Sequence, residues 1–413
     1  MSPRTAGVPR RRCAPWVFAL VTIAAYGLLA LPILARHVFD SSVFIVAGDR
    51  FVDAGRLVSP IIVQPHSDGY DGQFYYRMAL APLDQDQPAF GIRFDRPVSR
   101  MRRILYPVLA WGASLGRAQL VPAALFLLNL FGLGAVGMST LRLAVRLRLP
   151  EWTPFAIMLW PGFIIALTHD TAEIISAALL LWAVDSYLAK RLLCFGVLGA
   201  LATLTRETSI LVLGGIVCFE IAGAARQAPG AGRWRRALLC GLSLIPLPLW
   251  WAVLHLAWSQ LPRDADVAHD LGLPLLGVAT MLRDTLTGVR QLSPIPGLDI
   301  GLRAFALGGA AWLLGFIAFV VMRTPAALRR PATGALAAGW LAVLALMSTL
   351  TARGPWVEPT AYFRAFTECY IVGYLVLGHQ RAPRLLAGIM LIGGAVASIG
   401  AWGLSFLQFG LGG

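Results

Sequence analysis

Asp71 lies in the segment GYDGQFYYRMA, residues 69–79, where a carboxylate and several aromatic side chains interrupt a mostly apolar chain. A carboxylate can accept a proton from a hydroxyl group while a positioned electrophile is attacked. The pattern therefore predicts Asp71 as a general base beside a sugar or polyprenyl site lined by Tyr70, Tyr75 and Tyr76. The simpler alternative is that Asp71 caps a helix over residues 72–80, and that the aromatic residues anchor this helix at a membrane surface.

Asp49 and Asp53 in VAGDRFVDAG are four residues apart and would share one face of a helix. Asp49 is therefore a second candidate for the base, and either residue could be a metal ligand, although two carboxylates alone do not define a metal site. A solvated loop face is the alternative. The segment RPVSRMRRILYP, residues 96–107, adds four arginines that suit either a lipid phosphate or contact with the membrane edge. Among them we select Arg103 as a phosphate ligand.

Further charged residues lie at the borders of apolar stretches, where a charge is costly and by default faces a cavity or a partner. Asp170 and Glu173 in THDTAE have the spacing of a capping box, which would explain them without a substrate. Arg206 could pair with either of them or bind a lipid phosphate. The candidate substrate-binding residues of this group are Asp170, Glu173, Arg206, Glu207 and Arg364. His169 is expected to be a hydrogen-bonded group at a helix end.

The composition assigns these residues to a membrane protein. Of the 413 residues, 57% are hydrophobic and only 14% are charged, whereas about a quarter of the residues are charged in an ordinary soluble domain. The net charge of +14 comes almost wholly from arginines between apolar runs, since Lys190 is the only lysine. Because no zinc, helix-turn-helix or RNA-binding signature accompanies this charge, nucleic-acid binding is excluded.

Hydropathy predicts an all-α, polytopic transmembrane bundle in one domain, residues 1–413. About eleven apolar runs occur, near 16–35, 120–140, 152–168, 171–188, 192–205, 208–224, 237–258, 301–322, 333–350, 367–379 and 384–407. The run 104–116 is short and contains Pro107, so we expect an interfacial or re-entrant helix there. Two large loops follow from this division: residues 36–119, with interfacial helices, and residues 259–300.

The distribution of arginines among the loops predicts how the protein is oriented in the membrane. With a cytoplasmic N-terminus, alternation of the spans places every short basic loop on the cytoplasmic side. The same alternation collects the polar clusters, including THDTAE, TRET at 205–208 and the segment 353–368, on the outer side. Nucleoside triphosphates are absent there and the chain has no P-loop, so an outer enzyme would need a substrate activated in another way.

At this point GYDGQFYYRMA resembles the aromatic and Asp-Gly pattern in the first outer loop of GT-C-type integral membrane glycosyltransferases. The chain is similar in particular to bacterial cell-surface glycopolymer proteins and, more distantly, to GPI-mannosyltransferase-like enzymes. RRILYPVLAW, THDTAE and LTRET follow in the order this family leads us to expect. The resemblance covers roughly residues 15–225, and the C-terminal half matches only in hydropathy.

The resemblance implies a GT-C-like fold and a sugar donor carried on polyprenyl phosphate. It also implies an acidic base in the first outer loop, here Asp71 with Asp49 in reserve. The Asp-Gly pair lies about 35 residues beyond the first span, whereas many relatives place the acid close to the helix end, so both aspartates stay open.

The sequence thus predicts an inverting glycosyltransferase in the bacterial inner membrane, with its active site on the extracytoplasmic face. Its partners would be the lipid bilayer, the polyprenyl-phosphate sugar and a glycan or lipid acceptor. No nucleotide cofactor is needed, and a divalent metal is possible but has no supporting motif. The alternative is a transporter or flippase of lipid-linked glycans, which would be expected to show internal repeats that the sequence lacks.

Overall fold

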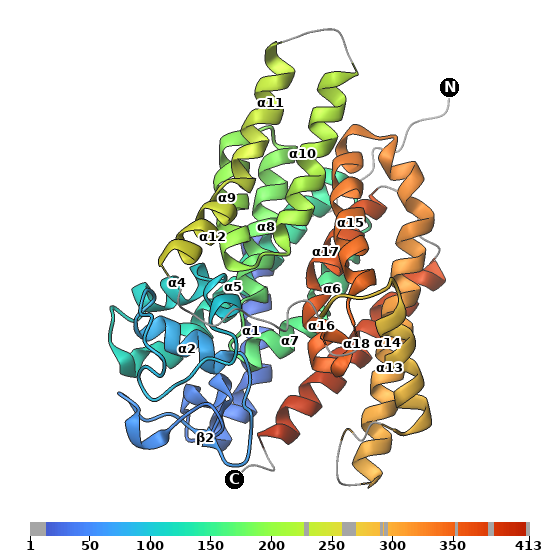
Figure 1. The fold of residues 1–413 in the computed structure, drawn as a ribbon. Coiled ribbons are helices and arrows are strands. Elements are labelled where there is room, and N and C mark those ends of the chain that lie inside the picture. The colour runs from blue at the N-terminus through green and yellow to red at the C-terminus, as the bar shows by residue number, and fades with distance from the viewer. Residues whose placement is uncertain are drawn as a thin grey trace.

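The protein is an all-α bundle with a small globular region at one end (Figure 1). The computed structural model describes residues 14–226, 231–257, 270–289, 292, 296–351, 354–378 and 384–409. Over these residues the strands are confined to one parallel pair of two residues each, β1 (Ala47–Gly48) and β2 (Val63–Gln64), with Ala47 opposite Val63. The predicted all-α class is confirmed.

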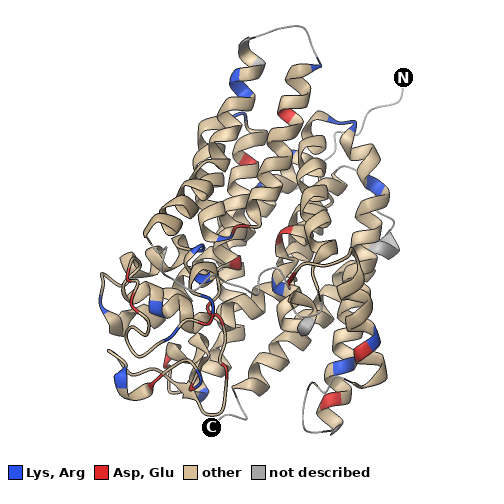
Figure 2. Cartoon of the chain, in the orientation of Figure 1, with Lys and Arg blue, Asp and Glu red and all other residues tan. Residues whose placement is uncertain are grey.

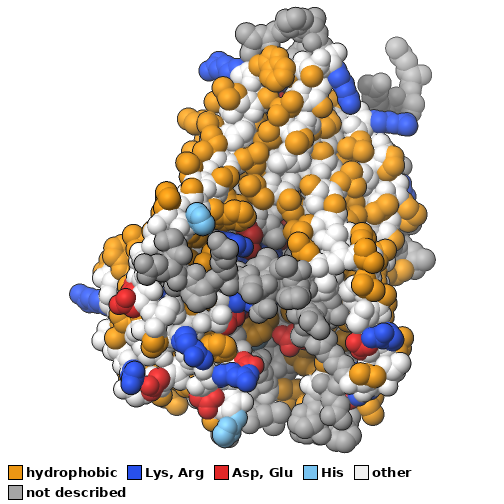
Figure 3. All heavy atoms as spheres, in the orientation of Figure 1, with side chains coloured by type: hydrophobic (Ala, Val, Ile, Leu, Met, Phe, Trp, Pro, Cys, Tyr) orange, Lys and Arg blue, Asp and Glu red, His pale blue; other side chains and the backbone are white. Residues whose placement is uncertain are grey.

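Six helical stretches of the described chain are long and apolar enough to cross a membrane, judged by length and composition. They are α1 (Pro15–Arg36), α5 (Val121–Leu147), the succession of α11 (Ala231–Gly241) and α12 (Pro246–Ala257), α14 (Pro296–Leu328), α15 (Pro331–Thr349) and α18 (Arg384–Gln408). Each corresponds to a predicted apolar run. Figure 3 shows a hydrophobic band over the helices and charged side chains gathered over the lower end.

The remaining apolar runs form shorter helices. They are α6 (Thr153–Met158), α7 (Pro161–Thr168), α8 (Glu173–Leu188), α9 (Leu192–Thr205), α10 (Ser209–Ala225) and α17 (Thr367–Leu377). The interruption predicted at Arg206 is confirmed, because α9 ends at Thr205 and α10 begins at Ser209. The run 152–168 is also broken, at Trp160, since Pro161 has no N–H to continue the helix.

The break between α6 and α7 leaves backbone carbonyls without helical partners inside the bundle. Hydroxyl groups from three other helices satisfy them: Tyr370 donates to Ala156, Tyr26 to Met158 and Ser398 to Leu159. In an apolar medium such carbonyls must be satisfied within the protein. Side chains of α17, α1 and α18 therefore make the broken helix compatible with a membrane.

The chain between α1 and α5 folds as one globular region. Its helices are α2 (Gly72–Leu80), α3 (Pro97–Met101) and α4 (Leu105–Ala113), joined by 3-10 turns at Ser41–Ile45, Ala54–Arg56 and Ala118–Leu120. The helix predicted over residues 72–80 is confirmed. α4 has only nine residues, too few to cross a bilayer. Phe74, Tyr76 and Ile92 are buried in the core of this region.

Gly48 lets two parts of this region approach closely. A Cβ atom at position 48 would lie 2.2 Å from the carbonyl oxygen of Ser67, so no larger residue fits. The Gly48 amide donates to the side chain of Gln73, at 3.1 Å, on the first turn of α2. This contact ties β1 to the start of α2 and so fixes the position of Asp71.

The opposite end of the bundle is held by other ion pairs. Arg142 and Arg146 of α5 both contact Asp185 of α8, at 2.9 Å each. Arg236 of α11 contacts Glu220 of α10 at 2.8 Å. Basic residues mark this upper end, where α10 and α11 extend beyond the other helices (Figures 1 and 2). The arginines at 10–12 and 381, which belong to the basic segments used to predict the orientation, lie outside the described residues.

Candidate functional site

A cluster of charged side chains forms where the globular region meets the ends of α8, α9, α10 and α17. We call it the charged cluster, and it consists of Asp71, Arg100, Arg103, Glu173, Arg206, Glu207, Arg364 and Glu368. Acidic and basic segments lie next to one another at this level of the molecule (Figure 2). Residues spread over almost 300 positions of sequence thus meet in one place.

Asp71 is held by two arginines. Its Oδ1 accepts a hydrogen bond from Nη1 of Arg100 at 2.7 Å, and its Oδ2 accepts one from Nη2 of Arg364 at 2.8 Å. Arg100 lies on α3, whereas Arg364 lies on α16 (Pro359–Ala365). Asp71 is at the N-cap position of α2, but its side chain makes no capping hydrogen bond. The capping explanation of Asp71 is therefore wrong, because both carboxylate oxygens bind guanidinium groups instead.

The electrostatic surroundings keep Asp71 ionised. Burial alone would raise the pKa of this carboxyl group, but the guanidinium groups of Arg100, Arg364 and Arg103 outweigh burial and hold the pKa well below its usual range. Nearby opposite charges favour the ionised form of an acid. A carboxylate with so low a pKa is a weak base as long as both arginines remain on it.

Ion pairs continue from Arg364 into the bundle. Its Nε lies 3.7 Å from Oε1 of Glu173, which also lies 4.0 Å from Nε of Arg206. Arg206 in turn pairs with Glu368 at 2.5 Å. Of the two expected partners of Arg206, Glu173 is met only at long range and Asp170 makes no hydrogen bond within the described residues, and the short contact of Arg206 is with Glu368. Positive and negative groups thus alternate from Arg100 to Glu368.

Arg103 and Glu207 form a second branch of the cluster. Two parallel hydrogen bonds join them, Nε to Oε2 at 2.9 Å and Nη2 to Oε1 at 2.8 Å. Such a bidentate pair fixes both side chains in direction as well as in distance. Nη1 of Arg103 also lies 3.5 Å from the hydroxyl group of Tyr75. The predicted residues Tyr75, Arg103 and Glu207 are therefore brought together beside Asp71.

Tyr70 contacts the charged cluster through Arg364. The guanidinium carbon of Arg364 lies 4.6 Å from the centre of the Tyr70 ring, a cation–π contact. The ring of His169 packs against the same tyrosine, with 4.5 Å between the two ring centres. The imidazole ring is hydrogen-bonded to the Ile165 carbonyl and to Gln408, as expected for a helix-end histidine.

Asp49 and Tyr76 lie apart from the charged cluster. The Asp49 carboxylate accepts hydrogen bonds from the backbone amides of His66 and Ser67, at 2.8 and 3.1 Å, and these bonds lower its pKa. It is exposed and shapes the turn that leads to Asp71. Tyr76 is fully buried in the core of the globular region, where its ring stabilises α2.

Asp170 has no capping function. α8 begins at Glu173 with Ala172 as N-cap and without a side-chain cap, so the predicted capping box is wrong. The reason is that the backbone of Asp170 is left-handed, with φ of 44°, which places this residue before the helix start. Asp170 is fully buried, and neither of its carboxylate oxygens has a hydrogen-bond partner among the described residues.

Two further expectations concern a metal site and the second predicted loop. No group of three or more His, Cys, Asp or Glu side chains that could hold a metal occurs within the described ranges. The second predicted loop, 259–300, is described over 270–289, 292 and 296–300, where it contains α13 (Leu276–Thr287), whereas residues 259–269 and the preceding Trp258 lie outside the described ranges. Asp270 of that loop pairs with Arg96 at 3.0 Å, which connects the two predicted loops.

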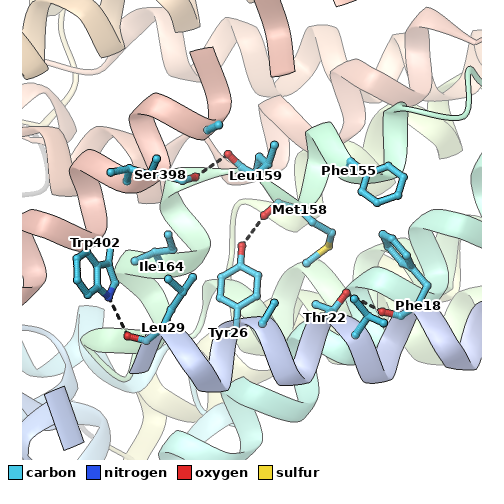
Figure 4. Close-up of a pocket in the computed structure, with 14 residues that line it drawn as sticks. Phe18, Thr22, Tyr26, Leu29, Phe155, Met158, Leu159, Ile164, Ser398 and Trp402 are labelled. Atoms are coloured by element: carbon cyan, nitrogen blue, oxygen red, sulfur yellow. Dashed lines mark hydrogen bonds between the residues drawn. The ribbon is translucent and has the colours of Figure 1, made fainter. Parts of the chain in front are cut away.

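An apolar groove of about 380 Å³ opens between α1, α6, α7 and α18 (Figure 4). The polar groups along it are turned to backbone carbonyls: Tyr26 donates to Met158, Ser398 to Leu159 and Trp402 to Leu29. The surface that remains is hydrocarbon. On α1 the lining extends from Phe18 to Leu29, roughly 16 Å at the rise of an α-helix.

The groove and the charged cluster lie at the two ends of α7. Ile164 lines the groove, and Thr168, one turn further, donates to the Ile164 carbonyl at 2.9 Å. His169 follows directly and packs on Tyr70, which is itself in contact with Arg364. The groove residues had no sequence signal, because they belong to ordinary apolar helices. Arg100 and Glu368 were visible as charges near the site, but nothing in their spacing selected them.

Comparisons of the chain with known protein families, with curated proteins and with solved structures find no match. The class defined by the fold and the composition is that of an all-α membrane protein with a largely buried cluster of arginines and carboxylates and an apolar groove.

Proposed function

We propose that the protein is an inverting membrane glycosyltransferase that transfers a sugar from a polyprenyl-phosphate donor to a glycan or lipid acceptor. The observation that carries this proposal is the meeting of Asp71 with Arg100 and Arg364, beside an apolar groove. A lipid-linked sugar phosphate needs three things: a base for the acceptor, cations for the departing phosphate and an apolar surface for the chain. The proposal is supported by a carboxylate and several guanidinium groups in one cluster, and by α7, which leads from this cluster to the groove.

In the proposed reaction the acceptor oxygen forms a bond to the anomeric carbon, while the bond from that carbon to the phosphate oxygen breaks. The acceptor's proton goes to Asp71. The phosphate keeps the bonding electrons on its oxygen and leaves as an anion that is still attached to the polyprenyl chain. Fixed positive groups lower the barrier by stabilising the charge that develops on the leaving phosphate. Arg364, Arg103 and Arg206 are the cations we assign to this task, with Arg100 added from the geometry.

The donor's lipid chain would lie in the apolar groove. Both α1 and α18, which border the groove, are candidate membrane spans, so a chain could enter sideways from the bilayer. Tyr70 and Tyr75, which contact Arg364 and Arg103, would lie beside the sugar. Asp170, with both carboxylate oxygens unpartnered in the described chain, is a candidate for binding hydroxyl groups of sugar or acceptor.

For the membrane arrangement we propose about eleven spans. The five shorter apolar runs, near 152–168, 171–188, 192–205, 208–224 and 367–379, would cross as broken or tilted helices beside the six long ones. The basic end of the bundle would face the cytoplasm, following the positive-inside rule. The charged cluster would then lie on the extracytoplasmic side of a bacterial inner membrane.

The test is sugar transfer by the purified protein, with polyprenyl-phosphate sugars as donors and extracted cell-envelope glycans and lipids as acceptors. We expect transfer by the wild type and at least about a hundredfold loss in Asp71→Asn. The matched control is Asp68→Asn, which removes an exposed carboxylate three residues away, where it pairs with exposed Arg50. Lipid flipping without any transfer would favour the alternative, a transporter of lipid-linked glycans.

A further inference from the structure

Asp71 and a donor phosphate would need the same two arginines. Arg100 and Arg364 each give Asp71 one hydrogen bond, at 2.7 and 2.8 Å, so both carboxylate oxygens are engaged. A phosphate placed between these guanidinium groups would have to take over at least part of those bonds. The acceptor hydroxyl group, in turn, needs a carboxylate oxygen that is free to receive its proton.

The charged cluster has no surplus of positive charge for an incoming anion. Its four arginines, at 100, 103, 206 and 364, face four carboxylates, at 71, 173, 207 and 368. An incoming anion would therefore leave the cluster with a net negative charge unless one of the carboxylates moves away from its arginine. Spare donors do exist: Nη1 and Nε of Arg364 are buried and have no hydrogen-bond partner among the described residues.

Of the four carboxylates, Asp71 is the one placed to move. Glu173 and Glu368 are almost fully buried, with 2% and 1% of their side chains exposed, and Glu368 is also held by Thr208 at 2.9 Å. Glu207 is bound by the two parallel bonds to Arg103. Asp71 is 17% exposed and lies at the N-cap position, directly before the first residue of α2.

Both arginines keep other contacts when Asp71 leaves. Arg100 donates from Nε and Nη2 to Asp95, at 2.9 and 2.7 Å. Arg364 keeps its ion pair with Glu173, at 3.7 Å, and its cation–π contact with the ring of Tyr70. The guanidinium groups would therefore stay in position to receive a phosphate.

From these contacts we infer an exchange: the phosphate of the lipid donor replaces Asp71 on Arg100 and Arg364, and the released carboxylate then becomes the base. This inference rests on the proposed function and adds an order to it, because the base is competent only after the donor has bound. The ion-paired state described here is the resting state. Without donor, the acceptor meets a carboxylate that cannot take its proton.

The exchange predicts that removing the Asp71 charge tightens phosphate binding. The probe is a synthetic polyprenyl phosphate without sugar, titrated into protein held in lipid nanodiscs. We expect Asp71→Asn to bind this lipid about tenfold or more tightly than the wild type, because the competing carboxylate is gone. Arg364→Gln should bind it more weakly than the wild type. Asp71→Ser serves as a second variant if Asp71→Asn does not fold.

Asp95→Asn is the matched control, since it removes one negative charge from the same Arg100 but leaves both bonds of Asp71 in place. We expect a much smaller tightening for this variant. Equal tightening in both variants would show a general charge effect and would overturn the exchange, as would unchanged or weaker binding by Asp71→Asn.

The proposed function can fail separately. Transfer activity with no tightening in Asp71→Asn rejects the exchange and keeps the glycosyltransferase. Tightening without transfer from any donor keeps the shared phosphate site and rejects the enzyme.

Discussion

Arg364 and Asp71 are separated by 293 positions in the chain, and their side chains meet at 2.8 Å between Nη2 and Oδ2. This pair joins the C-terminal half of the chain to the globular region that precedes α5. Arg100 of α3 binds the other carboxylate oxygen of Asp71, with 2.7 Å between Nη1 and Oδ1. Burying a carboxylate between two guanidinium groups costs desolvation free energy. The arrangement is therefore better explained by a role in catalysis than by a gain in stability.

Arg364→Gln should reduce sugar transfer strongly. The change removes a positive group from the leaving phosphate, and loss of one such group costs about a hundredfold to a thousandfold in rate. Arg364→Lys should recover only part of the rate, because an ammonium group cannot form the planar, forked contacts of a guanidinium group. The measurement is kcat with a polyprenyl-phosphate sugar. Arg50→Gln, at an exposed arginine outside the cluster, is the control, and equal rates in all four proteins would contradict the role of Arg364.

Acid should destabilise the wild type more than Asp71→Asn. The folded-state pKa of Asp71 lies below its unfolded value of about 3.9, so the unfolded chain binds the extra proton first. The ion pairs therefore contribute their full stability above that value, and this contribution is lost as the pH falls toward the folded-state pKa. The measurement is the thermal unfolding midpoint in detergent between pH 7 and pH 3.

The comparison with Asp71→Asn isolates this one group from the other carboxylates. The difference between the two midpoints should be largest at pH 7 and should shrink with acidification. A constant difference over the whole range would mean that the pKa of Asp71 is the same in the folded and unfolded chains, and would contradict the ion-paired carboxylate.

The pair of Arg103 and Glu207 should show strong energetic coupling. Its two hydrogen bonds connect the segment before α4 to the break between α9 and α10. Glu207→Gln or Arg103→Gln leaves the other partner charged and partly buried, so each single change should lower stability, whereas the double change should cost less than their sum. We expect a coupling of about 1 to 3 kcal/mol from a double-mutant cycle of unfolding free energies. Strict additivity would show that the two residues act independently.

The sequence predicted the helices well because their signal is local. Apolar runs, prolines and the charges at Arg206 and Glu207 are read directly along the chain, and the start of α2 at Gly72 and the break after Thr205 follow from them. It was less successful at Asp170. Spacing alone favoured a capping box, whereas the left-handed backbone at this residue ends α7 and delays the start of α8 to Glu173.

The pairing within the site could not be predicted in the same way. Charge at Asp71, Arg206 and Arg364 marked these residues as candidates, but which acid meets which arginine depends on how distant helices pack. The short contact of Arg206 with Glu368, 162 positions away, is an example. The groove gave no signal at all, because Tyr26, Ser398 and Trp402 look like any residues of a membrane helix until their polar atoms find backbone carbonyls.

Filling the groove should impair long-chain donors selectively. Ala395 lines the groove on α18, whereas the neighbouring Val396 is 63% exposed and does not line it. Ala395→Phe adds an aromatic ring to the space that the lipid chain would occupy, while Val396→Phe adds the same ring on the outer surface of the same helix. If a polyprenyl chain lies in the groove, Ala395→Phe raises KM for a long polyprenyl-phosphate sugar and leaves KM for a short, water-soluble analogue unchanged.

The short analogue separates a blocked chain site from a damaged active site, because its phosphate and sugar need only the charged cluster. Both phenylalanine variants should keep the wild-type unfolding midpoint within a few degrees, since neither changes a residue of that cluster. An equal rise in KM for both donors in Ala395→Phe would indicate distortion transmitted through α7 to Tyr70 and Arg364. Unchanged kinetics for both donors would place the lipid chain elsewhere on the bundle and leave the groove between α1 and α18 to ordinary membrane lipid.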